Sequence, residues 1–208
     1  MQYQKIINAT EKAVLTFLDE NEKEVIRAKE IFLKDYGQSE PIESVESDVD
    51  NKTFLFYYWL IFNYENKFTE QFLIKLVPTM KDSFDTLIWS VFEYHPKSIF
   101  GKAYLKDILT PKKLIISDEM PIQNLLKSDM FIGRVVMWEN HYIILPGIQM
   151  ISIELKSKIK KLFKTDKKLK NNKEALKANY ISVLQNLSAK VSRWNLYQPK
   201  NFEQIINL

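Results

Sequence analysis

Apolar and polar positions alternate with a helical period in the first part of the chain. Between residues 10 and 36 apolar side chains recur every three or four positions, which predicts one amphipathic helix facing a core. This stripe consists of Ala13, Val14, Phe17, Leu18, Val25, Ala28, Phe32 and Tyr36. Thr10 is a candidate N-cap and Gly37 a candidate C-terminal stop. We therefore expect an amino-terminal helix within residues 1–37.

Two further segments precede the middle of the chain. Residues 38–50 carry five acidic side chains, one proline and no basic residue, which predicts an exposed acidic linker. Residues 51–95 are expected to be helical. The aromatic run from Thr53 to Tyr64 favours a helix capped by Asp50. Helix starts are also expected at Thr69 and Thr79; the second helix is supported by the spacing of Phe84, Leu87, Ile88 and Val91.

The pattern changes after Pro96 to short apolar runs separated by turn residues, which predicts a small β unit over 97–153. The candidate strands are 99–105, 113–117, 130–138 and 141–153, and they contain Gly101, Gly133 and Gly147. Glycines inside strands are typical of bulges and bends in a curled sheet. Glu139 and Asn140 form a candidate hairpin turn.

A helical period returns after Glu154, so residues 154–208 are expected to form a long basic carboxy-terminal helix and a tail. The fold class that follows is α+β. It comprises a helical amino-terminal part, a small twisted β-barrel-like unit and the basic helix.

The amino-acid composition excludes several classes of catalytic and metal-binding site. The 208 residues are 46% hydrophobic and 27% charged, which is typical of a soluble globular protein. Cysteine is absent, which excludes disulfides, cysteine-based zinc sites and thiol nucleophiles. Only two histidines and four glycines are present, and no phosphate-binding loop or serine-nucleophile motif occurs. No cofactor or metal is expected, and the absence of a signal-like start predicts a cytoplasmic protein.

The net charge of +4 is distributed unevenly. Residues 155–179 hold ten lysines and two acidic residues, so this segment carries +8 and the remainder −4. A helix with one apolar and one basic face suits a polyanion. We therefore expect a non-enzymatic module that binds nucleic acid, with Arg134 as a subsidiary anchor. Aromatic residues of the β unit can add base stacking if they are exposed, namely Tyr104, Phe131, Trp138 and Tyr142. The lysines expected to make contact are Lys156, Lys158, Lys160, Lys161, Lys164, Lys167, Lys168 and Lys170.

Other interpretations of the same residues stay open. The lysines can be a solvated surface, or they can meet an acidic protein or the acidic linker of another subunit in a homo-oligomer. A protein-binding adaptor can use the aromatic segment 54–64 or the β unit. A hydrolase can use Asp107, Asp118, Glu119 and Asp129. The pairs Glu93/His95 and Glu139/His141, each two residues apart, would place a carboxylate and an imidazole on one face of a strand.

Residues 54–153 contain three elements in a recognisable order. These are Trp59, Phe62, Asn63 and Tyr64, then Leu105, Asp107, Leu109 and Thr110, and finally Ser128, Asp129, Gly133, Arg134, Val135 and Val136. This order resembles an uncharacterised bacterial family associated with SEC-C motif proteins. The resemblance implies a helical part followed by a small β unit. Asn63 replaces the family's aspartate, and without cysteine the chain lacks the zinc-binding tail.

Overall fold

A computed structural model describes residues 2–35, 46–64, 66–76, 78–97, 101–110, 112–118, 125–165 and 180–185. Its helices are α1 (Gln2–Glu20), α2 (Glu22–Asp35), α3 (Glu46–Trp59), a π-helical turn (Leu60–Tyr64), α4 (Asn66–Lys75), α5 (Pro78–Phe84) and α6 (Ile153–Thr165). Its strands are β1 (Ile88–His95), β2 (Tyr104–Asp107), β3 (Lys113–Ile115), β4 (Met130–Trp138), β5 (His141–Ile144) and β6 (Gln149–Met150).

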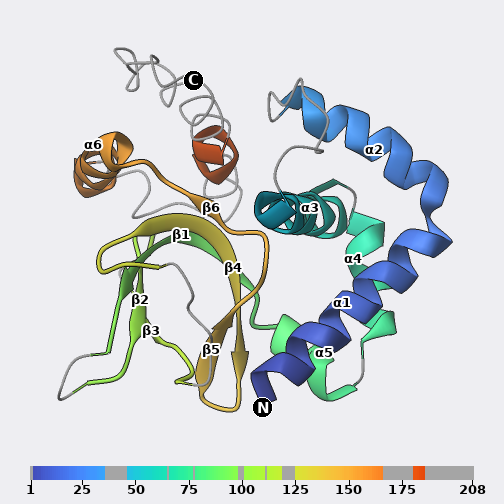
Figure 1. The fold of residues 1–208 in the computed structure, drawn as a ribbon, viewed down its shortest axis with the longest axis horizontal. Coiled ribbons are helices and arrows are strands. Elements are labelled where there is room, and N and C mark those ends of the chain that lie inside the picture. Colours follow the sequence, from blue (N-terminus) through green and yellow to red (C-terminus); the bar gives the residue numbers. More distant parts are fainter. Residues whose placement is uncertain are drawn as a thin grey trace. The chain divides into compact units, whose positions relative to one another are not determined.

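The chain divides into two compact units, which we describe separately. Unit 1 comprises residues 1–88, 117–121 and 134–148, and unit 2 comprises residues 89–116, 122–133 and 149–208. The combination of helices with a curled antiparallel sheet confirms the α+β class (Figure 1). No helix in the described ranges is long and apolar enough to cross a membrane.

Unit 1 begins with two helices where the sequence predicted one (Figure 1). The break falls at Asn21, whose side-chain amide donates to the Phe17 carbonyl at 2.8 Å. Asparagine side chains compete in this way for backbone groups and end helices. Thr10 is not an N-cap, because it lies inside α1 and its hydroxyl donates to the Ile6 carbonyl at 2.8 Å. Gly37 lies outside the described residues.

The predicted helix over the aromatic segment is confirmed by α3 and the π-helical turn that follows it. The helix starts at Glu46, so Asp50 is not its cap, and residues 46–50 of the expected linker are helical. Thr69 also lies within a helix, α4, and its hydroxyl donates to the Ile61 carbonyl at 2.8 Å. This bond ties α4 to the π-helical turn.

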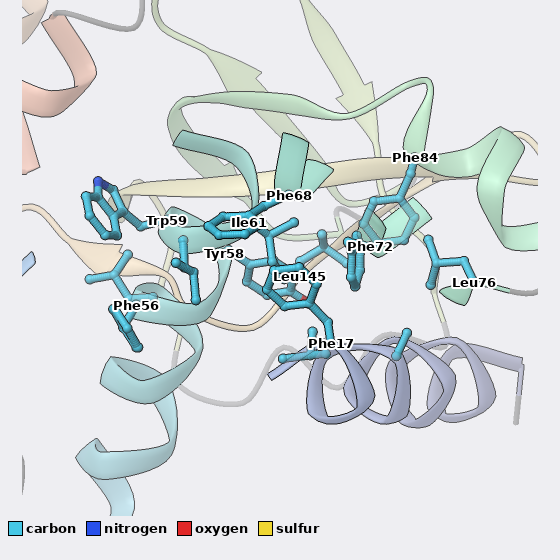
Figure 2. Close-up of a cluster of buried hydrophobic side chains, with 14 of the residues drawn as sticks. Phe17, Phe56, Tyr58, Trp59, Ile61, Phe68, Phe72, Leu76, Phe84 and Leu145 are labelled. Carbon is cyan, nitrogen blue, oxygen red and sulfur yellow. The ribbon is translucent and has the colours of Figure 1, made fainter. Parts of the chain in front are cut away.

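Aromatic side chains from α1, α3 and α4 fill the core of unit 1 (Figure 2). Phe17 meets Phe68 edge to face at 5.3 Å between ring centroids, and Phe72 meets Phe84 similarly at 5.4 Å. Such pairs contribute about 0.5–1.5 kcal/mol each beyond the burial of their area. Tyr58 is completely buried in the same cluster.

Gly147 allows the chain after β5 to pass close to α3. Its φ of +78° is a left-handed conformation, and a Cβ atom there would lie 2.7 Å from the Leu55 nitrogen and 2.8 Å from the Phe54 carbonyl carbon. Both obstacles are backbone atoms, so they cannot move aside as a side chain can. Only glycine fits this position.

The helix expected from Thr79 through Val91 is wrong beyond Phe84. The structure has the short helix α5, then a turn in which the Leu87 amide donates to the Phe84 carbonyl, and then strand β1 from Ile88. The segment 88–95 is rich in β-branched and aromatic side chains that favour a strand. Its apolar positions are dense enough to fit a helical spacing by coincidence.

The six strands form one sheet in the order β3-β2-β1-β4-β5, with β6 also paired to β4. β2 pairs antiparallel with β1 and with β3, while β5 and β6 pair antiparallel with β4. The predicted strand 130–138 is confirmed at both ends, and Glu139 and Asn140 form the predicted hairpin turn before β5. The candidate 141–153 instead splits into β5, β6 and the start of α6.

The core of unit 2 lies between its sheet and helical segments. Val91 of β1 and Met130 of β4 are buried with Leu155 and Ile159 of α6 and Ile181 of the helical segment 180–185. Helix α6 covers the first part of the segment predicted as a basic helix, as far as Thr165. Its expected continuation through residues 166–179 lies outside the described residues.

Candidate polyanion-binding surface

The predicted lysine contacts fall into three groups. Lys156, Lys158, Lys160 and Lys161 lie on α6 with described side chains. Lys164 also lies on α6, although its side chain is outside the described part of the helix. Lys167, Lys168 and Lys170 lie beyond the described residues.

Two of these lysines form ion pairs with carboxylates of unit 2. The Lys160 ammonium donates to Glu93 Oε1 at 2.6 Å, and that carboxylate is only 6% exposed. One turn earlier, Lys156 donates to the Ser128 carbonyl at 3.0 Å and to Asp129 Oδ1 at 3.2 Å. These two lysines border the apolar face formed by Leu155 and Ile159, and they fasten α6 to β1 and to the turn before β4. Lys158 and Lys161 are exposed on the helix.

Arg134 does not lie on a surface. Its side chain is 2% exposed in unit 1, donates to Asn63 Oδ1 and lies 5.9 Å from the centre of the Phe62 ring. The prediction of Arg134 as a phosphate anchor is therefore corrected, because burial leaves its guanidinium no access to a ligand. The Asn63 side chain that replaces an aspartate in the family resemblance is its hydrogen-bond acceptor.

The two units differ in charge far more than the basic segment alone indicated. Unit 2 contains 19 of the 30 basic residues and 7 of the 26 acidic residues, a net charge of +12, while unit 1 carries −8. The described part of unit 2 exposes lysines from its strands, loops and helix. They are Lys97, Lys102, Lys106, Lys112, Lys113, Lys127, Lys158 and Lys161, and we call them the basic surface.

The acidic side chains with described surroundings in unit 2 do not offset this surface. Glu93 is buried against Lys160. Asp107 is 1% exposed and accepts hydrogen bonds from the Ser90 hydroxyl and from the Leu109 and Thr110 amides. Asp129 accepts from the Leu126 amide as well as from Lys156. Each carboxylate supports the fold locally.

Three strands of unit 2 place aromatic and basic side chains on one face. Glu93 and His95 of β1 lie opposite Lys106 and Tyr104 of β2, and Lys106 in turn lies opposite Lys113 of β3. Directly paired residues project from the same face of a sheet. The His95 ring stacks on the Tyr104 ring at 4.6 Å with an interplanar angle of 6°. The Lys113 ammonium lies 4.0 Å from the centre of the same ring.

The geometry predicted for a carboxylate and histidine two residues apart is confirmed for one pair. His95 Nε2 lies 3.8 Å from Glu93 Oε2, as expected for neighbours on one face of a strand. Glu139, in contrast, occupies the hairpin turn with a φ of 52°, outside an extended strand. Among the described side chains, no three histidine or carboxylate groups come together as potential metal ligands.

Two further predictions change with burial. Within the aromatic segment 54–64, Phe56, Tyr58 and Trp59 belong to the core of unit 1, so these three rings are not available to a protein partner. Phe131, considered as a base-stacking residue, is completely buried against Phe92. The lysines of the loops and strands were not among the predicted contacts, although the recurrence of Lys97, Lys102 and Lys106 within ten residues could have suggested them.

No family model, curated protein or solved structure matches the chain. The resemblance of residues 54–153 to the SEC-C-associated family stays a prediction. The function must therefore be inferred from the charge distribution and the geometry of unit 2.

Proposed function

We propose that unit 2 binds nucleic acid electrostatically through its basic surface. The supporting observation is that eight lysines are exposed on its described part, while its three described carboxylates are buried or bound to neighbouring groups. Phosphates release counterions when lysines neutralise them. The affinity of such a surface therefore falls steeply as salt rises, and the salt dependence grows with the number of phosphates contacted.

The structure changes which lysines should matter. Lys156 and Lys160 fasten α6, so their replacement would combine loss of binding with loss of stability. Lys158 and Lys161 on the helix and Lys106 on β2 are exposed. Lys106 makes no ion pair with a described residue, which makes it the cleanest probe of the surface.

The test is fluorescence anisotropy with labelled single- and double-stranded DNA and RNA, in salt from about 50 to 200 mM. The variant combines Lys106→Glu, Lys158→Glu and Lys161→Glu. We expect its affinity at low salt to fall by at least about tenfold. The slope of log K against log salt should decrease by about 0.7–0.9 for each phosphate that is no longer neutralised.

The matched control combines Lys5→Glu, Lys12→Glu and Lys29→Glu on helix positions of unit 1. It changes the net charge of the whole chain by the same amount. We expect it to bind within about threefold of the native protein, because it leaves the basic surface intact. Equal losses in the two variants, or no binding by the native protein at low salt, would contradict the proposal.

A further inference from the structure

On the face of unit 2 formed by β1, β2 and β3, the Tyr104 ring contacts both a second ring and an ammonium group. Tyr104 is partly exposed, stacks on His95 at 4.6 Å and meets the Lys113 ammonium at 4.0 Å. His95 and Tyr104 are direct partners in the register of β1 and β2. The pairing of the strands thus holds the two rings parallel.

Two lysines meet beside this ring on neighbouring strands. Lys106 and Lys113 are direct partners in the register of β2 and β3, and both are exposed. Like charges directly opposite each other destabilise a pair of strands. A phosphate bound between the two ammonium groups would remove this repulsion and turn it into attraction.

Lys113 of β3 connects the two features, because its flexible, exposed side chain reaches the Tyr104 ring on the neighbouring strand. An ammonium at an exposed ring is held weakly, whereas a nucleic-acid base stacks on an aromatic ring more strongly. A base can therefore replace the ammonium on the ring and leave Lys113 to pair with the adjoining phosphate. Base stacking of this kind requires an unpaired base.

We propose that Tyr104, supported by His95, stacks against an unpaired base, and that Lys106 and Lys113 bind the adjoining phosphate. Unit 2 then prefers single-stranded nucleic acid to a duplex. This inference rests on the proposed function. It adds base stacking on Tyr104 to the electrostatic contacts between lysines and phosphates.

The test compares two labelled oligonucleotides of about 12 nucleotides, an oligothymidylate and an abasic strand of equal length. Both have the same phosphates, but only the first has bases. We expect the native protein to bind the oligothymidylate about tenfold more tightly than the abasic strand. Tyr104→Leu should remove this difference by weakening the oligothymidylate alone, whereas Tyr104→Phe, which retains the ring, should preserve it.

The native protein keeps the test decisive even if Tyr104→Leu fails to fold, since the comparison of the two ligands needs no variant. Equal binding of the two strands by the native protein would overturn stacking. Equal weakening of both by Tyr104→Leu would also overturn it, by assigning the ring a structural role. The proposed function would survive either result if the lysine reversal still lowered the affinity by about tenfold, and both proposals fail if neither strand binds at low salt.

Discussion

The two units are built on different principles. Eight buried aromatic residues belong to the described core of unit 1, whereas the buried cluster of unit 2 around α6 consists of aliphatic side chains and one methionine, and Phe92 and Phe131 are buried outside that cluster. Unit 2 adds buried polar contacts, such as Asp107 with its loop and Glu93 with Lys160. Unit 1 also carries a net −8 and unit 2 a net +12. Aromatic residues therefore indicate the stable interior of one unit, while lysines indicate the binding surface proposed for the other.

The comparison is tested most severely by removing one aromatic side chain from unit 1. Phe72→Ala deletes a fully buried ring that contacts both Phe62 and Phe84. We expect the free energy of unfolding to fall by about 3–5 kcal/mol, because both hydrophobic transfer and packing are lost. Chemical denaturation followed by circular dichroism measures this change.

Ile74→Ala provides the matched control on the same helix, because Ile74 is 74% exposed. Its effect should stay within about 0.5 kcal/mol, as is usual for surface positions. A comparable loss in both variants would show that the aromatic cluster does not dominate the stability of unit 1.

A smaller effect is expected from the polar support in unit 2. Asp107→Ala removes the acceptor of the Leu109 and Thr110 amides at 2.9 and 3.2 Å, and of the buried Ser90 hydroxyl. We expect a loss of about 2–3 kcal/mol, since hydrogen bonds to charged groups are strong and buried donors become unsatisfied. Hydrogen exchange at the two amides should accelerate together with the loss of stability.

Asp107→Asn is the conservative comparison, because it retains an acceptor oxygen and the shape of the side chain. It should recover at least half of the stability that alanine loses. If the two variants behaved alike, the carboxylate would contribute little to the loop, and unit 2 would depend on its apolar core as unit 1 does.

The sequence predicted those helices and strands that depend on local patterns, and it missed those that depend on specific side-chain bonds or on strand pairing. The amphipathic spacing of α1 and α6 and the strand 130–138 are local signals, and all three elements were found. The break at Asn21 and the strand at Ile88 depend on a side-chain bond and on sheet pairing, which periodicity does not register.

The basic surface was also predicted only in part, because its contacts join residues that are distant in sequence. Lysine composition located part of the basic surface, but the partners of Lys156 and Lys160 lie far away in sequence, at Asp129 and Glu93. Arg134 looked like a surface cation within an apolar strand, and only the fold shows its contact with Asn63. The pairing of Lys106 with Lys113 likewise requires the register of β2 and β3.

The smallest expected effect compares one tyrosine in each unit at alkaline pH. Burial raises the pKa of Tyr57 in unit 1 and of Tyr94 in unit 2 above the usual 10.0. Above pH 10 the unfolded chain therefore loses protons that the folded chain still holds, so stability is fully present below pH 10 and falls as pH rises from there. The slope for one tyrosine is at most about 1.4 kcal/mol per pH unit.

Tyr57→Phe and Tyr94→Phe each remove one ionising group and keep the ring. We expect each variant to resemble the native protein at pH 7 and to lose stability less steeply above pH 10, in thermal unfolding measured across that range. An unchanged alkaline slope in Tyr94→Phe would mean that its hydroxyl ionises equally in both states. A flatter slope in both variants would show that the two units, despite their different cores, protect a tyrosine hydroxyl by the same desolvation.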